Sequence, residues 1–256
     1  MKRHTTAALV VLTHATLLVV AFFVLAAVFE FPDILRAPPE RILAVFRASQ
    51  HLIVPTYWGF TMTGVTFIAM TVAVSGVVPS RTAHTAGVLA GLTQAFGFIR
   101  WVWLVPALAA TATDPGASDA SRDAALVVFE AMHQFAGVSV GEHLSFLFQG
   151  VWTIAVGATL VRDERFSRGL GYAGVATGAA FVVYTFEQFG GVFAGLGQLN
   201  VVFHVAWLAW LALLATTFLK ASRRPEGAFV PVGRRAVAVA TGGATLLLLA
   251  ATVGVA

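Results

Sequence analysis

The stretch that decides the fold runs from Asp123 to Val161, DAALVVFEAMHQFAGVSVGEHLSFLFQGVWTIAVGATLV. It places ionisable and amide side chains inside otherwise apolar sequence, namely Glu130, His133, Glu142, His143 and Gln149. An ionisable group at the centre of a membrane costs about 2.5–3.5 kcal/mol on insertion scales, so it tends to have a partner or a function. We therefore expect a membrane protein whose site lies in or beside this stretch.

The composition supports a membrane protein. The chain has 256 residues, of which 58% are hydrophobic and 11% are charged, and its mean hydropathy is +0.84. A soluble domain carries about 25% charged residues. The absence of cysteine excludes disulfides, thiolate metal sites and iron–sulfur clusters. We find no nucleic-acid motif, and we interpret the pI near 10.1 as a sign of membrane topology.

A helix needs about 20 apolar residues to cross the hydrocarbon of a bilayer. Seven stretches meet or approach that length: 7–28, 52–78, 86–110, 144–161, 169–186, 201–219 and 236–255. The first is too long for the core of a signal peptide, so we interpret it as an uncleaved spanning helix. We predict an all-α integral membrane bundle of seven transmembrane helices that forms a single domain over residues 1–256.

The orientation follows from the lysines and arginines of the short loops. With the N-terminus inside, eleven lie on the inner side: Lys2, Arg3, Arg81, Arg162, Arg165, Arg168, Lys220, Arg223, Arg224, Arg234 and Arg235. Four lie on the outer side: Arg36, Arg41, Arg47 and Arg122. An odd number of spans then places the C-terminus outside, and we expect a multi-pass protein of the cell membrane.

Two outer loops are predicted to form short amphipathic helices on the membrane surface. One starts at Pro38-Pro39-Glu40 and would lay Ile42, Leu43, Val45 and Phe46 on that surface. The other covers residues 123–137 and would be capped by Ser121 or Asp119. Gly137 and Gly141 are then expected to allow a turn into the fourth span. In the fifth span, Gly174 and Gly178 are expected to let a neighbouring helix approach closely.

Polar residues of the third to sixth spans gather at the outer half of the predicted bundle. The candidate ligand-binding residues are Arg100, Glu142, His143, Gln149, Glu187 and His204. Polar stripes on helices face the bundle interior rather than lipid, so we expect an outward-opening pocket between these spans. A structural alternative is an ion pair of Arg100 with Glu142 or Glu187. Glu130 and His133 are interpreted as a solvated pair, and Trp207 and Trp210 as packing residues.

Metal and haem chemistry stay open as alternatives. His143, His204 and Glu187 are the candidate metal ligands, although no H-E-x-x-H or H-x-x-x-H spacing is present. His143 and His204 are also the one pair suited to haem. Membrane hydrolases of the alkaline ceramidase and adiponectin receptor group carry histidines on the last span, and residues 236–255 contain none. A retinal protein is excluded because the lysines, Lys2 and Lys220, lie outside the spans.

Residues 86–190 resemble a widespread family of uncharacterised bacterial and archaeal multi-spanning proteins, known as a domain of unknown function. The resemblance rests on FGFIRWVW, which contains Arg100, and on FLFQGVWTIAVGATLVRDERFSRGLGYAGVATG. Where the family has a proline ahead of the second motif's Leu-Gly, this chain has Ser167, Arg168 and Gly169. The resemblance implies the architecture and no reaction.

From the sequence we expect a binding protein rather than an enzyme. Its ligand would be a small molecule, a lipid or a membrane-protein partner, held in the outer-half pocket around Arg100 within the lipid bilayer. No cofactor and no nucleic acid are expected. The alternatives are a redox or hydrolytic protein that holds haem or a divalent metal at His143 and His204, and a structural subunit of a larger membrane complex.

Overall fold

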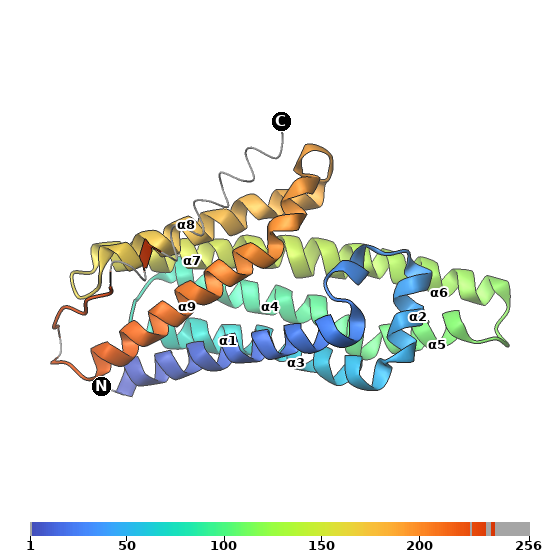
Figure 1. Ribbon diagram of the computed structural model, residues 1–256, viewed down its shortest axis with the longest axis horizontal. Coiled ribbons are helices and arrows are strands. Elements are labelled where there is room, and N and C mark those ends of the chain that lie inside the picture. The colour runs from blue at the N-terminus through green and yellow to red at the C-terminus, as the bar shows by residue number, and fades with distance from the viewer. Residues whose placement is uncertain (1, 226, 234–236, 239–256) are drawn as a thin grey trace. The chain divides into compact units, whose positions relative to one another are not determined.

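The computed structural model describes residues 2–225, 227–233 and 237–238, and their regular structure is helical (Figure 1). The elements are α1 (Lys2–Phe29), η1 (Asp33–Arg36), α2 (Pro39–Ala48), α3 (Gln50–Ser75), α4 (Arg81–Trp103), α5 (Val105–Thr113), α6 (Asp119–Met132), η2 (His133–Leu144), α7 (Ser145–Arg162), α8 (Arg168–Tyr184), η3 (Thr185–Phe189), η4 (Gly191–Leu199) and α9 (Asn200–Ser222). The predicted all-helical fold class is confirmed.

Six helices of the described chain are long and apolar enough to cross a membrane: Lys2–Phe29, Gln50–Ser75, Arg81–Thr113, Asp119–Arg162, Arg168–Phe189 and Gly191–Ser222. They correspond to the first six predicted spans. The predicted seventh span, 236–255, lies outside the described residues apart from two positions, so the seven-helix count stays a prediction. The same holds for the orientation of the chain.

The fourth span differs from the prediction. Asp119–Arg162 is a single helical run of 44 residues made of α6, η2 and α7, so the expected turn at Gly137 and Gly141 is wrong. At about 1.5 Å of rise per residue this run is roughly 66 Å long, about twice the hydrocarbon thickness. Part of it must therefore extend beyond the hydrocarbon.

The start of this run also differs from the prediction. The N-cap is Ser118, whose side-chain oxygen accepts a hydrogen bond from the Ser121 backbone N–H at 3.2 Å. Ser121 and Asp119, the two expected caps, lie inside the first turn. An Asx-type turn at Asp114, whose carboxylate accepts from Gly116 N at 2.8 Å, brings the chain to the cap. The cap was misplaced because several residues of this Ser- and Asp-rich loop have suitable side chains.

The chain divides into two compact units that interleave in sequence. The first unit comprises residues 1–15, 66–92 and 143–256, and the second comprises 16–65 and 93–142. Helices α1, α3 and α4 contribute residues to both. Each unit is built from separate segments of chain, so the division does not follow the order of the sequence, and the single-domain prediction is left untested.

The first unit is organised by close contact between α7 and α8, with α9 packed on α8 (Figure 1). A Cβ on Gly178 would lie 2.6 Å from the Gly150 carbonyl oxygen, and a Cβ on Gly174 would lie 2.8 Å from the Trp210 ring. The predicted role of Gly174 and Gly178 is thus confirmed. Trp207 and Trp210 are buried, and their N–H groups donate to Thr153 Oγ1 at 3.0 Å and to the Leu170 carbonyl at 3.1 Å.

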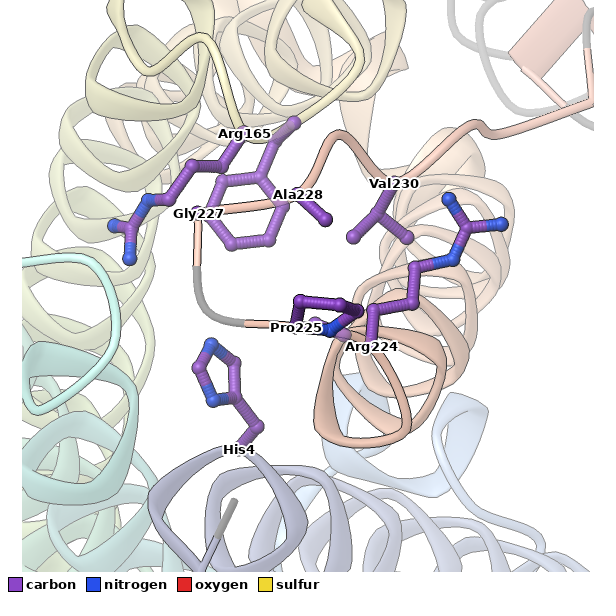
Figure 2. Close-up of a pocket in the computed structure, with 9 residues that line it drawn as sticks. His4, Arg165, Arg224, Pro225, Gly227, Ala228 and Val230 are labelled. Atoms are coloured by element: carbon purple, nitrogen blue, oxygen red, sulfur yellow. The ribbon is translucent and has the colours of Figure 1, made fainter.

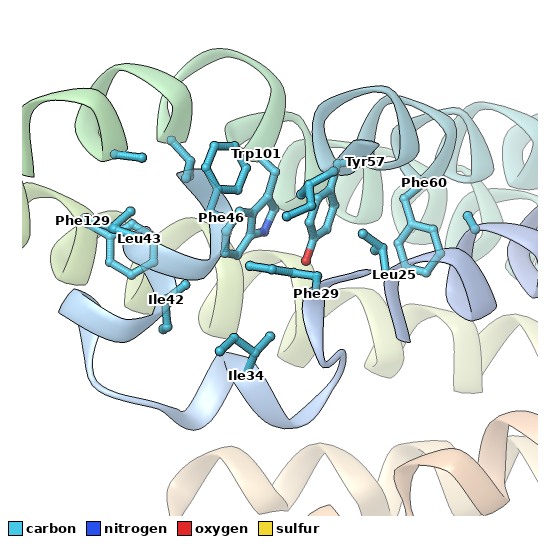
Figure 3. Packing of buried hydrophobic residues seen from close by; sticks show 14 residues of the cluster. Leu25, Phe29, Ile34, Ile42, Leu43, Phe46, Tyr57, Phe60, Trp101 and Phe129 are labelled. Carbon is cyan, nitrogen blue, oxygen red and sulfur yellow. The ribbon is translucent and has the colours of Figure 1, made fainter. Parts of the chain in front are cut away.

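The second unit has an aromatic core (Figure 3). Tyr57 and Trp101 are stacked with ring centroids 4.8 Å apart, and Phe29 meets the Trp101 ring edge to face at 5.2 Å. Such aromatic pairs contribute about 0.5–1.5 kcal/mol beyond the burial of their area. Trp101 brings the last turn of α4 into this core, and Arg100 is the residue before it in the sequence.

The short helix predicted at Pro38-Pro39-Glu40 forms as α2, with Pro39 in its first turn. Ile42, Leu43 and Phe46 are buried in the core of the second unit. The expectation that these side chains lie on a membrane surface is wrong, because α5 and the aromatic rings provide the apolar partners that lipid was expected to provide.

Candidate functional site

Arg100 is the buried cation of the second unit. It lies in the last turn of α4 and is 7% exposed. The apolar sequence on both sides keeps this part of the chain helical and places the arginine one residue before the stacked Trp101. Its guanidinium carbon lies 5.2 Å from the centroid of the Trp101 ring, within the range of a cation–π contact.

Hydrogen bonds fix the guanidinium at two of its nitrogens. Nη1 donates to the backbone carbonyl of Gly97, and Nη2 lies 3.4 Å from Nδ1 of His133. Among the described residues, Nε is buried with no hydrogen-bond partner. The Nε–H group is therefore a buried donor that no described residue accepts.

The π-helical segment η2 provides the space for Arg100. A Cβ on Gly137 would lie 2.8 Å from the guanidinium carbon of Arg100. A Cβ on Gly141 would lie 2.7 Å from Gly97 Cα. These two glycines thus allow the close approach of α4 and do not form a turn. The helical run continues through them because its packing against α4 requires small residues there. Single π turns inside α-helices are frequent at functional sites, and η2 extends this geometry over 12 residues.

His133 is the functional candidate that the sequence interpretation missed. Besides its contact with Arg100, its Nε2 lies 3.1 Å from the Leu35 carbonyl oxygen. The interpretation of Glu130 and His133 as a solvated pair is therefore wrong for His133, while Glu130 is exposed. The signal that could have identified it is its position four residues, about one helical turn, before Gly137.

Two further groups bear on the electrostatics of Arg100. Glu142 and the Tyr57 phenol lie near enough to the guanidinium to interact with it electrostatically. The Tyr57 hydroxyl is fully buried and, within the described part of the chain, has no hydrogen-bond partner. A buried polar group without a partner costs about 1–3 kcal/mol, so both Tyr57 and Arg100 suit a further acceptor.

The other predicted site residues belong to the first unit. His143 Nδ1 lies 3.0 Å from the Thr185 carbonyl oxygen, and His204 Nδ1 lies 2.9 Å from the Asn200 carbonyl oxygen. Glu187 accepts a hydrogen bond from the side chain of Gln188 at 2.8 Å.

Gln149 is 4% exposed in α7, and its Nε2 has no hydrogen-bond partner among the residues described.

The six predicted residues thus divide into two sets. Arg100 and Glu142 belong to the second unit, and His143, Gln149, Glu187 and His204 to the first. The predicted pocket that joins all six stays a prediction. In residues 2–225, 227–233 and 237–238, no three histidine, aspartate or glutamate side chains gather closely enough to hold a metal ion.

Taken together, the six long apolar helices and the buried polar groups within them define a multi-pass helical membrane protein. A family model, the domain of unknown function DUF4386, matches residues 5–219. The chain belongs to that family, as the resemblance in the sequence implied, and the match extends well beyond residues 86–190. No curated protein and no solved structure matches the chain.

Proposed function

We propose that this membrane protein binds a ligand through Arg100, and that the ligand offers a carboxylate or phosphate oxygen. A small molecule or a lipid with such a group meets this requirement. Arginine is the side chain best suited to it, because its planar guanidinium can donate two parallel hydrogen bonds to one anion.

The observation that carries the proposal is the pair of buried polar atoms without partners, Arg100 Nε and the Tyr57 hydroxyl. Native proteins satisfy nearly all buried polar groups with protein or water. Two buried donors of this kind in one unit, one of them on the positively charged guanidinium itself, favour an acceptor that the described residues do not provide. Glu142 contributes a balancing negative charge and His133 holds the guanidinium in place.

On the topology that we propose, this site lies at the outer side of the membrane. We propose an inner N-terminus, because the lysines and arginines of the short loops are concentrated on that side. Arg100 lies near the C-terminal end of α4, which starts at the inner loop residue Arg81. A ligand would then reach the site from the outer leaflet or from the outer aqueous phase.

The test is a thermal-shift titration of the detergent-purified full chain. The probe is dodecanoate, an anionic amphiphile, and its uncharged twin is dodecanol. We expect dodecanoate to raise the melting temperature in a saturable manner and dodecanol to do so less. The substitution Arg100→Gln should remove the difference between the two probes, because glutamine retains hydrogen bonding and loses the charge.

The matched control is Arg47→Gln, since Arg47 is an exposed arginine of the same unit that contacts Gln50. It should leave the dodecanoate response intact. Equal responses of the Arg100→Gln and Arg47→Gln proteins would contradict the proposal. An absorption spectrum of the same sample tests the alternative at His143 and His204: a Soret band would make the haem interpretation the leading one.

A further inference from the structure

The first unit contains a small pocket that the proposed function does not use (Figure 2). Its volume is about 90 Å³, and its lining consists of His4, Arg165, Phe166, Ala221, Arg224, Pro225, Gly227, Ala228 and Val230. A water molecule takes about 30 Å³ in the liquid, so the pocket admits a group of several heavy atoms. It is independent of Arg100, which belongs to the other unit.

Backbone hydrogen bonding builds the wall of this pocket. The Val230 N–H donates to the Arg165 carbonyl at 2.9 Å, and Phe166 pairs with Val230 in an isolated bridge. This bond ties the segment after α9 to the loop between α7 and α8. The Phe166 and Val230 side chains are buried and form the apolar part of the lining. The polar side chains of the lining are more exposed.

The ionisable side chains that line the described part of this pocket are basic. The His4 ring points into the pocket from the first turn of α1 (Figure 2). It meets the Phe218 ring edge to face, with ring centroids 6.3 Å apart. Arg224 is exposed at the end of α9, and its Nη1 donates to the Phe229 carbonyl at 2.5 Å. That bond engages one of the five N–H groups of a guanidinium. Arg165 is held by Asp163 at 2.6 Å.

More exposed cations of the first unit add to this positive charge: Lys2, Arg3, Arg81, Arg162, Arg168, Lys220 and Arg223. The acidic residues of the same loops are Asp163, which is paired with Arg165, and Glu164. Glu226, between Pro225 and Gly227 in the sequence, lies outside the described residues. The field here attracts anions, and basic pockets between transmembrane helices hold lipid head groups in this way.

The position of the pocket points to its ligand. The lining comes from the first turn of α1, from the loop that follows α7 and from the end of α9. The ends of spanning helices meet the head-group region of a bilayer. We propose that this pocket binds the phosphate group of an anionic phospholipid, with His4 and Arg224 as its hydrogen-bond donors. On the proposed topology, that lipid belongs to the inner leaflet.

The experiment measures binding to the detergent-purified full chain by thermal shift. One arm titrates short-chain phosphatidylglycerol and the other titrates inorganic phosphate. Saturable stabilisation by the lipid and none by phosphate identifies a lipid head group, whereas stabilisation by both identifies the phosphate chemistry with a free anion as a second source. Stabilisation by neither overturns the proposal.

Two neighbouring arginines give a matched pair of variants. Arg224→Gln should weaken phosphatidylglycerol binding about tenfold, since a hydrogen bond to a charged group is lost, and Arg224→Lys should recover part of it. Arg223→Gln removes the same charge one residue away, outside the lining, and should change binding less than twofold. Equal weakening by Arg223→Gln and Arg224→Gln would show a general surface charge effect and would overturn the pocket as the site.

A third variant, His4→Phe, retains an aromatic ring against Phe218 and removes both ring nitrogens. We expect it to weaken phosphatidylglycerol binding, measured as the shift in melting temperature relative to the same variant without lipid. Dodecanoate binding at Arg100 should be unchanged in all of these variants. That result separates failure of this proposal from failure of the proposed function.

Discussion

Arg100 in the second unit and Arg165 in the first differ in burial and in hydrogen-bond partners. Each guanidinium lies over the ring of the next residue, at 5.2 Å from Trp101 and 5.3 Å from Phe166. Arg165 is partly exposed and forks onto the carboxylate of Asp163, with Nε at 2.9 Å and Nη2 at 2.6 Å from its two oxygens. Arg100 is buried and is held by a carbonyl, a histidine and an aromatic ring.

This difference between the two arginines distinguishes a structural charge from one that is suited to bind a ligand. Arg165 is paired with the Asp163 carboxylate and also donates to the Val77 carbonyl at 3.3 Å. It therefore has a structural role and connects two loops. Arg100 keeps a buried N–H group that no described residue accepts. A buried charge that the protein leaves incompletely satisfied is costly, and such a group calls for an explanation, of which a bound water, ion or functional role is one.

The largest expected effect concerns the close approach of the Gly141 and Gly97 backbones. Gly141→Ala places a Cβ 2.7 Å from the Gly97 backbone, and backbone atoms cannot rotate away. We expect a loss of about 1–3 kcal/mol in the free energy of unfolding, which is typical of overpacking. The measurement is denaturant unfolding in detergent.

Gly59→Ala is the control for that substitution. Gly59 lies in α3 of the same unit, and a Cβ there would meet no atom within 4 Å. Alanine should be neutral or stabilising by up to about 1 kcal/mol, because glycine is unfavourable within a helix. If both variants lose the same stability, the close approach of Gly97 and Gly141 does not exist.

The second effect concerns His133, the partner that holds Arg100. His133→Phe retains the ring and removes its contacts with Arg100 Nη2 and the Leu35 carbonyl. We expect a loss of about 1–2 kcal/mol in unfolding free energy, because the Arg100 guanidinium and the Leu35 carbonyl each lose a hydrogen-bond partner. Glu130→Gln should change stability by less than about 0.5 kcal/mol, as expected at an exposed position. Equal losses would restore the interpretation of a solvated pair.

The third effect is smaller and tests Arg100 directly. Arg100→Met should change unfolding free energy by less than about 1 kcal/mol while abolishing dodecanoate binding. Removing one member of a buried ion pair costs about 3–5 kcal/mol. A loss of that size would mean that Arg100 pairs tightly with Glu142 and has a structural role.

The smallest effect concerns Asp163 and depends on pH. Hydrogen bonds from Arg165 hold the pKa of the Asp163 carboxyl below its usual value. A depressed pKa in the folded state stabilises the protein above the pKa of the unfolded chain, and this stabilisation is lost as pH falls through the folded value. Asp163→Asn should therefore lower the melting temperature slightly at pH 7. The gap from the unmodified protein should close toward pH 3, whereas a constant gap would exclude the charge as its cause.

The sequence predicted some contacts and misplaced others for reasons that individual residues make clear. Gly174 and Gly178 were identified because helix packing in membranes requires small residues one turn apart. Gly137 and Gly141 show the same chemistry, yet they were assigned to a turn, because a glycine pair between two predicted helices indicates a break equally well. The structure resolves the ambiguity, since Arg100 and Gly97 occupy the space beside them.

The amino-acid sequence by itself determined that the chain is helical and crosses a membrane several times, because apolar length and charge depletion are local properties. It also identified Arg100, since a cation within an apolar run stands out in one dimension. Only the tertiary structure showed that Tyr57, His133 and Gly137 lie around this arginine, and that His4 and Arg224 line the same pocket. These residues are far apart in the chain, and their contacts depend on helix rotation and packing, which hydrophobic patterning leaves open.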